Sequence, residues 1–169
     1  MCFKRILAAI DASPLSQLVF DQALEIAERD GATLKLFHCM SSDVIAGMPH
    51  FSSELGLSPQ FLTVSQHNQY HLEQQSREIR DLLRRYCEMA RSRNVPVEFE
   101  YRMMDAGQGL CQTAQTWQAD LVVIGRRGRR GIAEALLGSV SNYVLHHASC
   151  AVLVIQAANQ TAAAASSSV

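Results

Sequence analysis

Short, continuous runs of apolar residues recur along the chain, separated by longer segments of mixed polarity. Each run is rich in β-branched residues and too short to make a helix, so it predicts a buried strand. A further strand is expected at residues 95–101, where apolar and polar residues alternate as in a half-exposed strand at a sheet edge. The continuous runs are residues 4–10, 33–39, 121–124 and 151–155.

The segments between these runs show helical spacing, with apolar residues three or four positions apart. The first helix is expected to begin with Ser13 as its cap and Pro14 in its first turn, and to end near Gly31. Residues 41–66 show no sustained period, so we expect a long loop or lid with a helical turn near 58–64. The other helices are expected at residues 70–93, 110–117 and 140–148.

Alternating strands and helices predict an α/β fold, a single-domain open five-stranded parallel sheet with helices on both faces. In a sheet with strand order 3-2-1-4-5, the winding direction reverses between the first and fourth strands, and ligands bind beyond the carboxyl ends of the strands there. Asp11 ends the first strand and Gly125 ends the fourth. The topology therefore predicts a binding site between these two residues. We expect the domain to span residues 1–156 and to be followed by a disordered tail at 157–169.

Glycines with a fixed spacing follow the fourth predicted strand. Gly125, Gly128 and Gly138 form the pattern Gly-x2-Gly-x9-Gly-Ser, and a helical segment begins at the last glycine. Bare backbone N–H groups and the helix dipole suit an anion, so the pattern predicts phosphate binding. A purely turn-forming role for the glycines is the alternative interpretation. No lysine accompanies them, so this is not a Walker A loop.

Together these features resemble the universal stress protein family, in its ATP-binding branch. The resemblance rests on the first strand ending in Asp11, the glycine motif, and the closing segment GSVSNYVLHHASCAVLVI, and it runs from Phe3 to about Ile155. It implies a Rossmann-like sheet that binds ATP or a related adenine nucleotide. Mg²⁺ would then arrive with the phosphates rather than in a protein cage.

The resemblance also implies a set of nucleotide contacts. Asp11 would accept hydrogen bonds from the nucleoside, and backbone groups of Cys39 would meet the edges of adenine. Ser139 would both cap the helix and touch phosphate, and the Ser141 hydroxyl would reach phosphate too. The alternatives are a turn or capping role for Asp11 and a plain core role for the apolar members. The expected contacts are Ala9, Ile10, Asp11, Cys39, Ile124, Gly125, Arg127, Gly128, Gly138, Ser139, Val140 and Ser141.

The implied function is that of a dimeric sensor or stress-response module, with pairing through the last strand, Ala151–Ile155. We expect no catalytic residues and at most slow ATP hydrolysis, because the motifs of hydrolases, pyrophosphatases and dinucleotide oxidoreductases are missing. Two other functions stay open. One is a dimeric interaction module without nucleotide, and the other is a slow nucleotide hydrolase or a binder of AMP or a cyclic nucleotide.

Composition narrows the partners. The net charge of −1 argues against a general nucleic-acid coat, and no apolar stretch reaches the length of a membrane helix. Five scattered cysteines without a C-x-x-C pair are typical of reduced thiols in the cytoplasm. The arginines at 126, 127, 129 and 130 fit a solvated basic loop, contact with a polyphosphate or, less well, nucleic acid. No metal-ligand pattern is evident, because the histidines in HNQYH lack the glutamate of the zinc motif.

Overall fold

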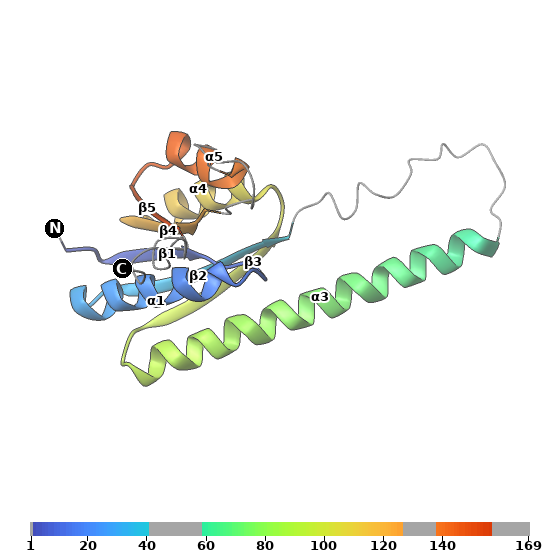
Figure 1. Ribbon diagram of the computed structural model, residues 1–169, viewed down its shortest axis with the longest axis horizontal. Coiled ribbons are helices and arrows are strands. Elements are labelled where there is room, and N and C mark those ends of the chain that lie inside the picture. The colour runs from blue at the N-terminus through green and yellow to red at the C-terminus, as the bar shows by residue number, and fades with distance from the viewer. Residues whose placement is uncertain (1, 41–58, 127–137, 157–169) are drawn as a thin grey trace, which may run out of the picture.

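One parallel sheet organises the molecule (Figure 1). This computed structural model describes residues 2–40, 59–126 and 138–156, and within the long helix it describes side chains from residue 73 onward. The strand order is β3-β2-β1-β4-β5, which confirms the predicted α/β fold. The strands are β1 (Arg5–Ala9), β2 (Thr33–Met40), β3 (Val97–Met103), β4 (Leu121–Gly125) and β5 (Ala151–Ile155).

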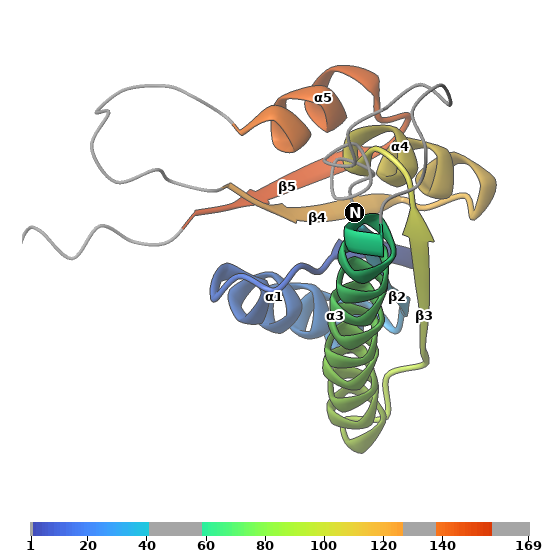
Figure 2. The same ribbon diagram turned by 90° about the vertical axis from the view of Figure 1, so that its right-hand side faces the viewer.

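Helices cover both faces of the sheet. Figure 2 shows α4 and α5 on one face, and α1 and α3 on the other. This arrangement follows from the parallel strands, since each crossover must return along one face of the sheet. None of the helices in the described part of the chain is long and apolar enough to cross a membrane. The helices are α1 (Leu15–Asp30), α3 (Pro59–Ser92), α4 (Ala106–Thr116) and α5 (Ser139–His147).

The central strand β1 divides the core into two layers. Ile6 and Ala8 pack against the α1 and α3 side, whereas Leu7 packs against the α4 and α5 side, and all three side chains are fully buried. A strand buried on both faces reads as a continuous apolar run, which is why the pattern at 4–10 lacks alternation. Strand β3 lies at the edge of the sheet, as its alternating pattern predicts, but Phe99, an apolar position of that pattern, is exposed together with Met103.

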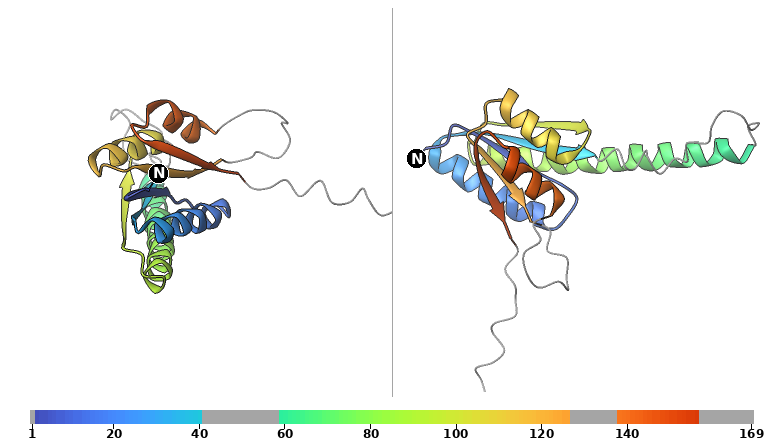
Figure 3. Two further views of the ribbon diagram at one scale, coloured as in Figure 1. Left: turned by 90° about the vertical axis from the view of Figure 1, so that its left-hand side faces the viewer. Right: turned by 90° about the horizontal axis from the view of Figure 1, so that it is seen from above.

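Helix α3 begins earlier than the sequence pattern predicts. It starts at Pro59, so the expected loop is wrong for residues 59–66, and the helical turn expected near 58–64 is the first part of this long helix. Beyond Pro59 no glycine or proline interrupts the segment, and a proline in the first position suits a helix start. The amino-terminal half of α3 extends well past the sheet (Figures 1 and 3). Residues 41–58 and the expected tail at 157–169 lie outside the described residues.

Candidate functional site

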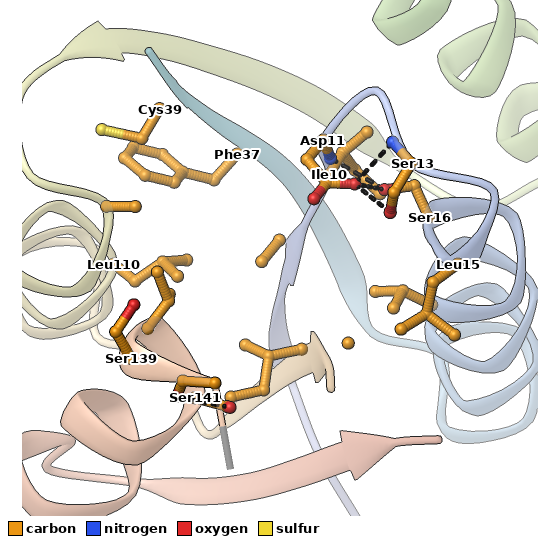
Figure 4. A pocket seen from close by; sticks show the side chains of 17 residues that line it. Ile10, Asp11, Ser13, Leu15, Ser16, Phe37, Cys39, Leu110, Ser139 and Ser141 are labelled. Atoms are coloured by element: carbon orange, nitrogen blue, oxygen red, sulfur yellow. Dashed lines mark hydrogen bonds between the residues drawn. The ribbon is translucent and has the colours of Figure 1, made fainter. Parts of the chain in front are cut away.

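A cavity of about 300 Å³ opens at the carboxyl end of the sheet, where the winding direction reverses. It lies between the exit of β1, the exit of β4 and the first turn of α5, as the topology predicts. Such a volume is at the lower end of the range that holds small-molecule ligands. Figure 4 shows its lining side chains. They are Ala9, Ile10, Asp11, Ser13, Leu15, Ser16, Val19, Phe37, Cys39, Ala106, Leu110, Ile124, Gly125, Gly138, Ser139, Val140 and Ser141.

Asp11 is held by hydroxyl groups of its own turn. Its Oδ1 atom accepts hydrogen bonds from Ser13 N–H at 2.8 Å, from the Ser13 hydroxyl, and from the Ser16 hydroxyl at 2.7 Å. The Ser16 oxygen in turn accepts from Asp11 N–H at 2.8 Å, and Ser16 is only 3% exposed. This is an Asx-type turn, so the turn-forming role weighed for Asp11 is real. The cluster also fixes the Asp11 carboxylate at the rim of the cavity (Figure 4).

The same cluster corrects the predicted cap of the first helix. The cap position of α1 is occupied by Pro14, with no side-chain hydrogen bond to the helix. Ser13 is wrong as the expected cap, because its hydroxyl donates to Asp11 instead. Ser13 still helps the helix start through its carbonyl, which accepts from Ser16 N–H at 3.1 Å.

The first turn of α5 forms another wall of the cavity. Its cap position is Gly138, not Ser139, and it makes no side-chain capping hydrogen bond. Ser139 is the first helical residue and is exposed, so the cap role expected for it is wrong. The first backbone N–H groups of a helix have no partner within the helix, and the helix dipole adds partial positive charge there. An anion in the cavity would meet this end of α5.

Ser141 differs from its neighbour. Its side chain is 2% exposed, and its hydroxyl donates to the Gly138 carbonyl at 3.0 Å. The hydroxyl proton is therefore used within the helix start, against the expectation that it reaches a phosphate. Ser141 therefore stabilises the first turn of α5, whereas the Ser139 side chain is exposed and lines the cavity.

Gly125 and Gly138 differ in how much space the surrounding protein leaves for a side chain. A Cβ atom on Gly125 would lie 2.7 Å from Leu15 Cδ2, so glycine lets α1 pack closely against the exit of β4. A Cβ atom on Gly138 would meet only the Ser141 hydroxyl oxygen, at an ordinary 3.7 Å. The backbone of Gly138 has φ −55° and ψ 156°, which any residue adopts. Protein packing thus explains Gly125 but leaves Gly138 unexplained.

The opposite end of the cavity is apolar. Ile10, Phe37 and Ile124 line it and are almost fully buried, so the two isoleucines belong to the core and also border the cavity. Cys39 lies beside them, and its thiol donates to the Met104 carbonyl at 2.9 Å. Burial raises the pKa of the Cys39 thiol, which therefore stays protonated at neutral pH. This end of the cavity suits a flat apolar group.

Ten of the twelve predicted contacts line the cavity, whereas Arg127 and Gly128 lie outside the described residues. The prediction missed several lining residues. Ser13 and Ser16 are readable in principle, because serines two and five positions after a strand-ending aspartate can fold back onto it. The others arrive through helix packing, which local sequence does not encode. They are Leu15, Val19, Phe37, Ala106 and Leu110.

The described residues contain no group of three or more histidine, cysteine, aspartate or glutamate side chains placed to hold a metal ion. Among the lining residues Asp11 is the one carboxylate. The site therefore offers an anion-favouring helix end, one anchored carboxylate and an apolar slot.

Sequence comparison relates the chain to known proteins. The sequence profile of the universal stress protein family matches residues 3–156. The universal stress protein Sll1388 of Synechocystis is 35% identical over 161 residues, a match that covers 92% of this chain and 99% of the relative.

Solved structures share the fold. The universal stress protein UspA from Lactobacillus plantarum superposes with a TM-score of 0.70 at 22% identity, covering 92% of this chain and 99% of that one. A universal stress protein in complex with cAMP gives 0.64 at 22% identity, covering 92% and 98%. A family protein from Arabidopsis thaliana with AMP bound gives 0.56 at 20% identity, covering 90% and 91%.

Proposed function

The chain belongs to the universal stress protein family, and from that premise we propose that it binds an adenine nucleotide, with ATP as the first candidate, in the cavity at the carboxyl end of the sheet. We propose further that it works as a regulatory sensor and not as a dedicated enzyme. One observation carries the proposal. The start of α5, with a glycine that packing does not require, borders the same cavity as the anchored carboxylate of Asp11.

In this proposal each part of the nucleotide meets a different wall. The base occupies the apolar end between Ile10 and Leu110, the ribose donates to Asp11, and the phosphates meet the first amides of α5 and the Ser139 hydroxyl. Arg127 and Gly128 would contribute from the segment that precedes the helix in the sequence. Mg²⁺ would be held by the phosphates, because one carboxylate among the described lining residues does not make a protein cage.

Catalysis is not favoured by the groups that line the cavity. The described lining residues include no histidine or lysine, the Cys39 thiol is protonated, and Oδ1 of the one carboxylate, Asp11, already accepts three hydrogen bonds, so a dedicated general base is not favoured. We therefore propose binding with at most slow hydrolysis. AMP and cAMP are the rival ligands, since they are bound by two proteins of this fold.

Native mass spectrometry of the purified full chain, followed by calorimetric titration with ATP, AMP and cAMP, tests the proposal. We expect a co-purifying adenine nucleotide or saturable binding of at least one of the three. A protein that arrives empty and binds none of them would instead support the interaction-module alternative, whose cavity has no ligand.

We also propose that the chain forms a homodimer through β5. This strand lies at the end of the sheet order, and its residues Val152–Ile155 are only partly buried, so it is a short apolar edge that needs cover. Light scattering should give twice the chain mass, and Val154→Arg should shift the mass toward the monomer. An unchanged dimer in a folded variant would contradict pairing at this edge.

The cysteines favour the cytoplasm as the place of action. All five are free thiols, and Cys87 is buried within the core. Reduced thiols of this kind are typical of a reducing compartment.

A further inference from the structure

The pairing between β1 and β2 stops just short of the cavity. The strand register ends at Ala9 opposite Phe37, and the last backbone bond runs from Ile10 N–H to the Phe37 carbonyl at 2.8 Å. In a regular parallel ladder the next bond would run from Cys39 N–H to the Ile10 carbonyl. Among the described residues that bond is absent. Something else holds the Ile10 carbonyl.

The imidazole of His38 is hydrogen-bonded to this carbonyl. Its Nδ1 atom lies 2.7 Å from the Ile10 oxygen, and because a carbonyl can only accept, Nδ1 carries the proton. The ring is stacked near Tyr101, with centroids 6.1 Å apart and planes 7° from parallel. Burial lowers the pKa of His38, so the ring is neutral at neutral pH. A side chain of β2 thus replaces a backbone donor of the same strand.

The consequence falls on the backbone of Cys39. Along β2, Leu34 and Met40 bond toward β3, whereas Phe37 bonds toward β1. Because backbone groups alternate in direction along a strand, the N–H and C=O of Cys39 point to the β1 side, beyond the point where β1 has ended. Cys39 also lines the cavity (Figure 4). A donor and an acceptor are thus presented side by side at its apolar end.

We infer that His38 is the positioning residue that sets the base specificity of this site, because by occupying the Ile10 carbonyl it keeps the Cys39 N–H and C=O available to a purine. The inference rests on the proposed function, since it concerns the ligand of the same cavity. An adjacent donor and acceptor match a 6-amino purine, whose N1 accepts and whose amino group donates. They mismatch a 6-oxo purine, which carries a donor at N1 and an acceptor at C6.

Two substitutions separate the donor of His38 from its ring. His38→Phe keeps a ring beside Tyr101 but removes the hydrogen-bond donor, and the Ile10 carbonyl then captures Cys39 N–H. His38→Asn loses the ring but retains an amide N–H at the δ position, where Nδ1 stood. Calorimetry with ATP and inosine triphosphate measures the preference for the 6-amino base in each protein. We expect the wild type to prefer ATP, His38→Phe to lose about tenfold of that preference, and His38→Asn to keep most of it.

Amide hydrogen exchange supplies a measurement that needs no variant. In the nucleotide-free wild type, Cys39 N–H should exchange fast for a residue inside a sheet, and ATP should slow it. Protection of this amide in the free protein would overturn the inference. So would a folded His38→Phe variant with unchanged base preference while the wild type binds ATP. A wild type that binds neither nucleotide would instead refute the proposed function, and the inference would fall with it.

Discussion

The two sides of the cavity differ in how their polar groups are held. At the exit of β1, the Asp11 carboxylate is tied by the Ser13 and Ser16 side chains before any ligand arrives. At the start of α5, Gly138 offers no side chain and makes no side-chain capping bond. One side is built for fixed geometry, and the other is left open for an incoming group. A ligand with a hydroxylated centre and an anionic end would use both, which is the character of a nucleotide.

The largest effect is expected from a charged side chain at the start of α5, which would block the open side of the cavity. Gly138→Glu places a carboxylate at the start of α5, where the added Cβ meets only the Ser141 oxygen at 3.7 Å. Like charges in contact cost several kcal/mol, so we expect ATP affinity to fall at least about 100-fold. Calorimetry measures the loss, and thermal unfolding should show a folded domain. Gly138→Gln is the matched control, since it adds the same bulk without charge. Equal losses in both variants would mean that bulk alone blocks the site.

A smaller effect on ATP affinity is expected when the Asp11 side chain loses its charge. Asp11→Asn keeps the size of the side chain but weakens its acceptor, so ATP affinity should fall about tenfold. The affinity ratio between ATP and its 2′- and 3′-deoxy analogues should shrink with it. Asp81→Asn, an exposed position on α3 whose carboxylate pairs with Arg84, is the control. Full discrimination against the deoxy analogues in Asp11→Asn would assign Asp11 to the turn alone.

Ser16→Ala tests how rigid the tied side is. The Ser16 hydroxyl donates to the Asp11 carboxylate and accepts from Asp11 N–H, and the side chain is buried, so its removal should lower the free energy of unfolding by about 1–2 kcal/mol. Urea denaturation measures this. Ser13→Ala should cost less, because Ser13 is partly exposed and its N–H still reaches Asp11. The reverse order would show that Ser13 is the main anchor.

The last expected effect is a dependence of stability on pH. The pKa of His38 is lowered in the folded state, mainly by burial, so below its ordinary value of about 6.5 the unfolded chain binds more protons than the folded one. Stability should therefore fall as pH drops below about 6.5, by at most about 1.4 kcal/mol per pH unit. Denaturation midpoints between pH 5 and 8 measure the slope, and His38→Asn should flatten it. An equal slope in both proteins would trace the effect to other groups.

The sequence predicted the sheet well because each strand carries its own signal. The continuous run around Leu7 follows from burial on two faces, and the alternation at 95–101 predicts the edge position that β3 occupies, although Phe99 itself is exposed. The start of α3 was missed because the polar residues between 59 and 75, many of them glutamines, give no apolar period, although they interrupt no helix. The lack of an apolar period is weak support for a loop where glycine and proline are also missing.

The site was predicted in position more than in detail. Topology and the glycine spacing brought Asp11 and Ser139 to one cavity, but they did not distinguish Ser139 from Ser141. Which of two nearby serines faces inward depends on how α5 is rotated against the sheet, and that is set by packing around Val144. The role of His38 was also invisible, because it depends on where the ladder between two strands ends.

The outermost strand, β5, is hydrogen-bonded to the backbone at the mouth of the cavity. The β4–β5 ladder runs to Gly125 opposite Ile155, and one residue further Arg126 N–H donates to the Ile155 carbonyl at 2.8 Å. The peptide units where the glycine segment departs are thus hydrogen-bonded to the rim of the sheet. In the homodimer proposed through β5, a change in occupancy of the cavity would reach the partner across one pair of strands.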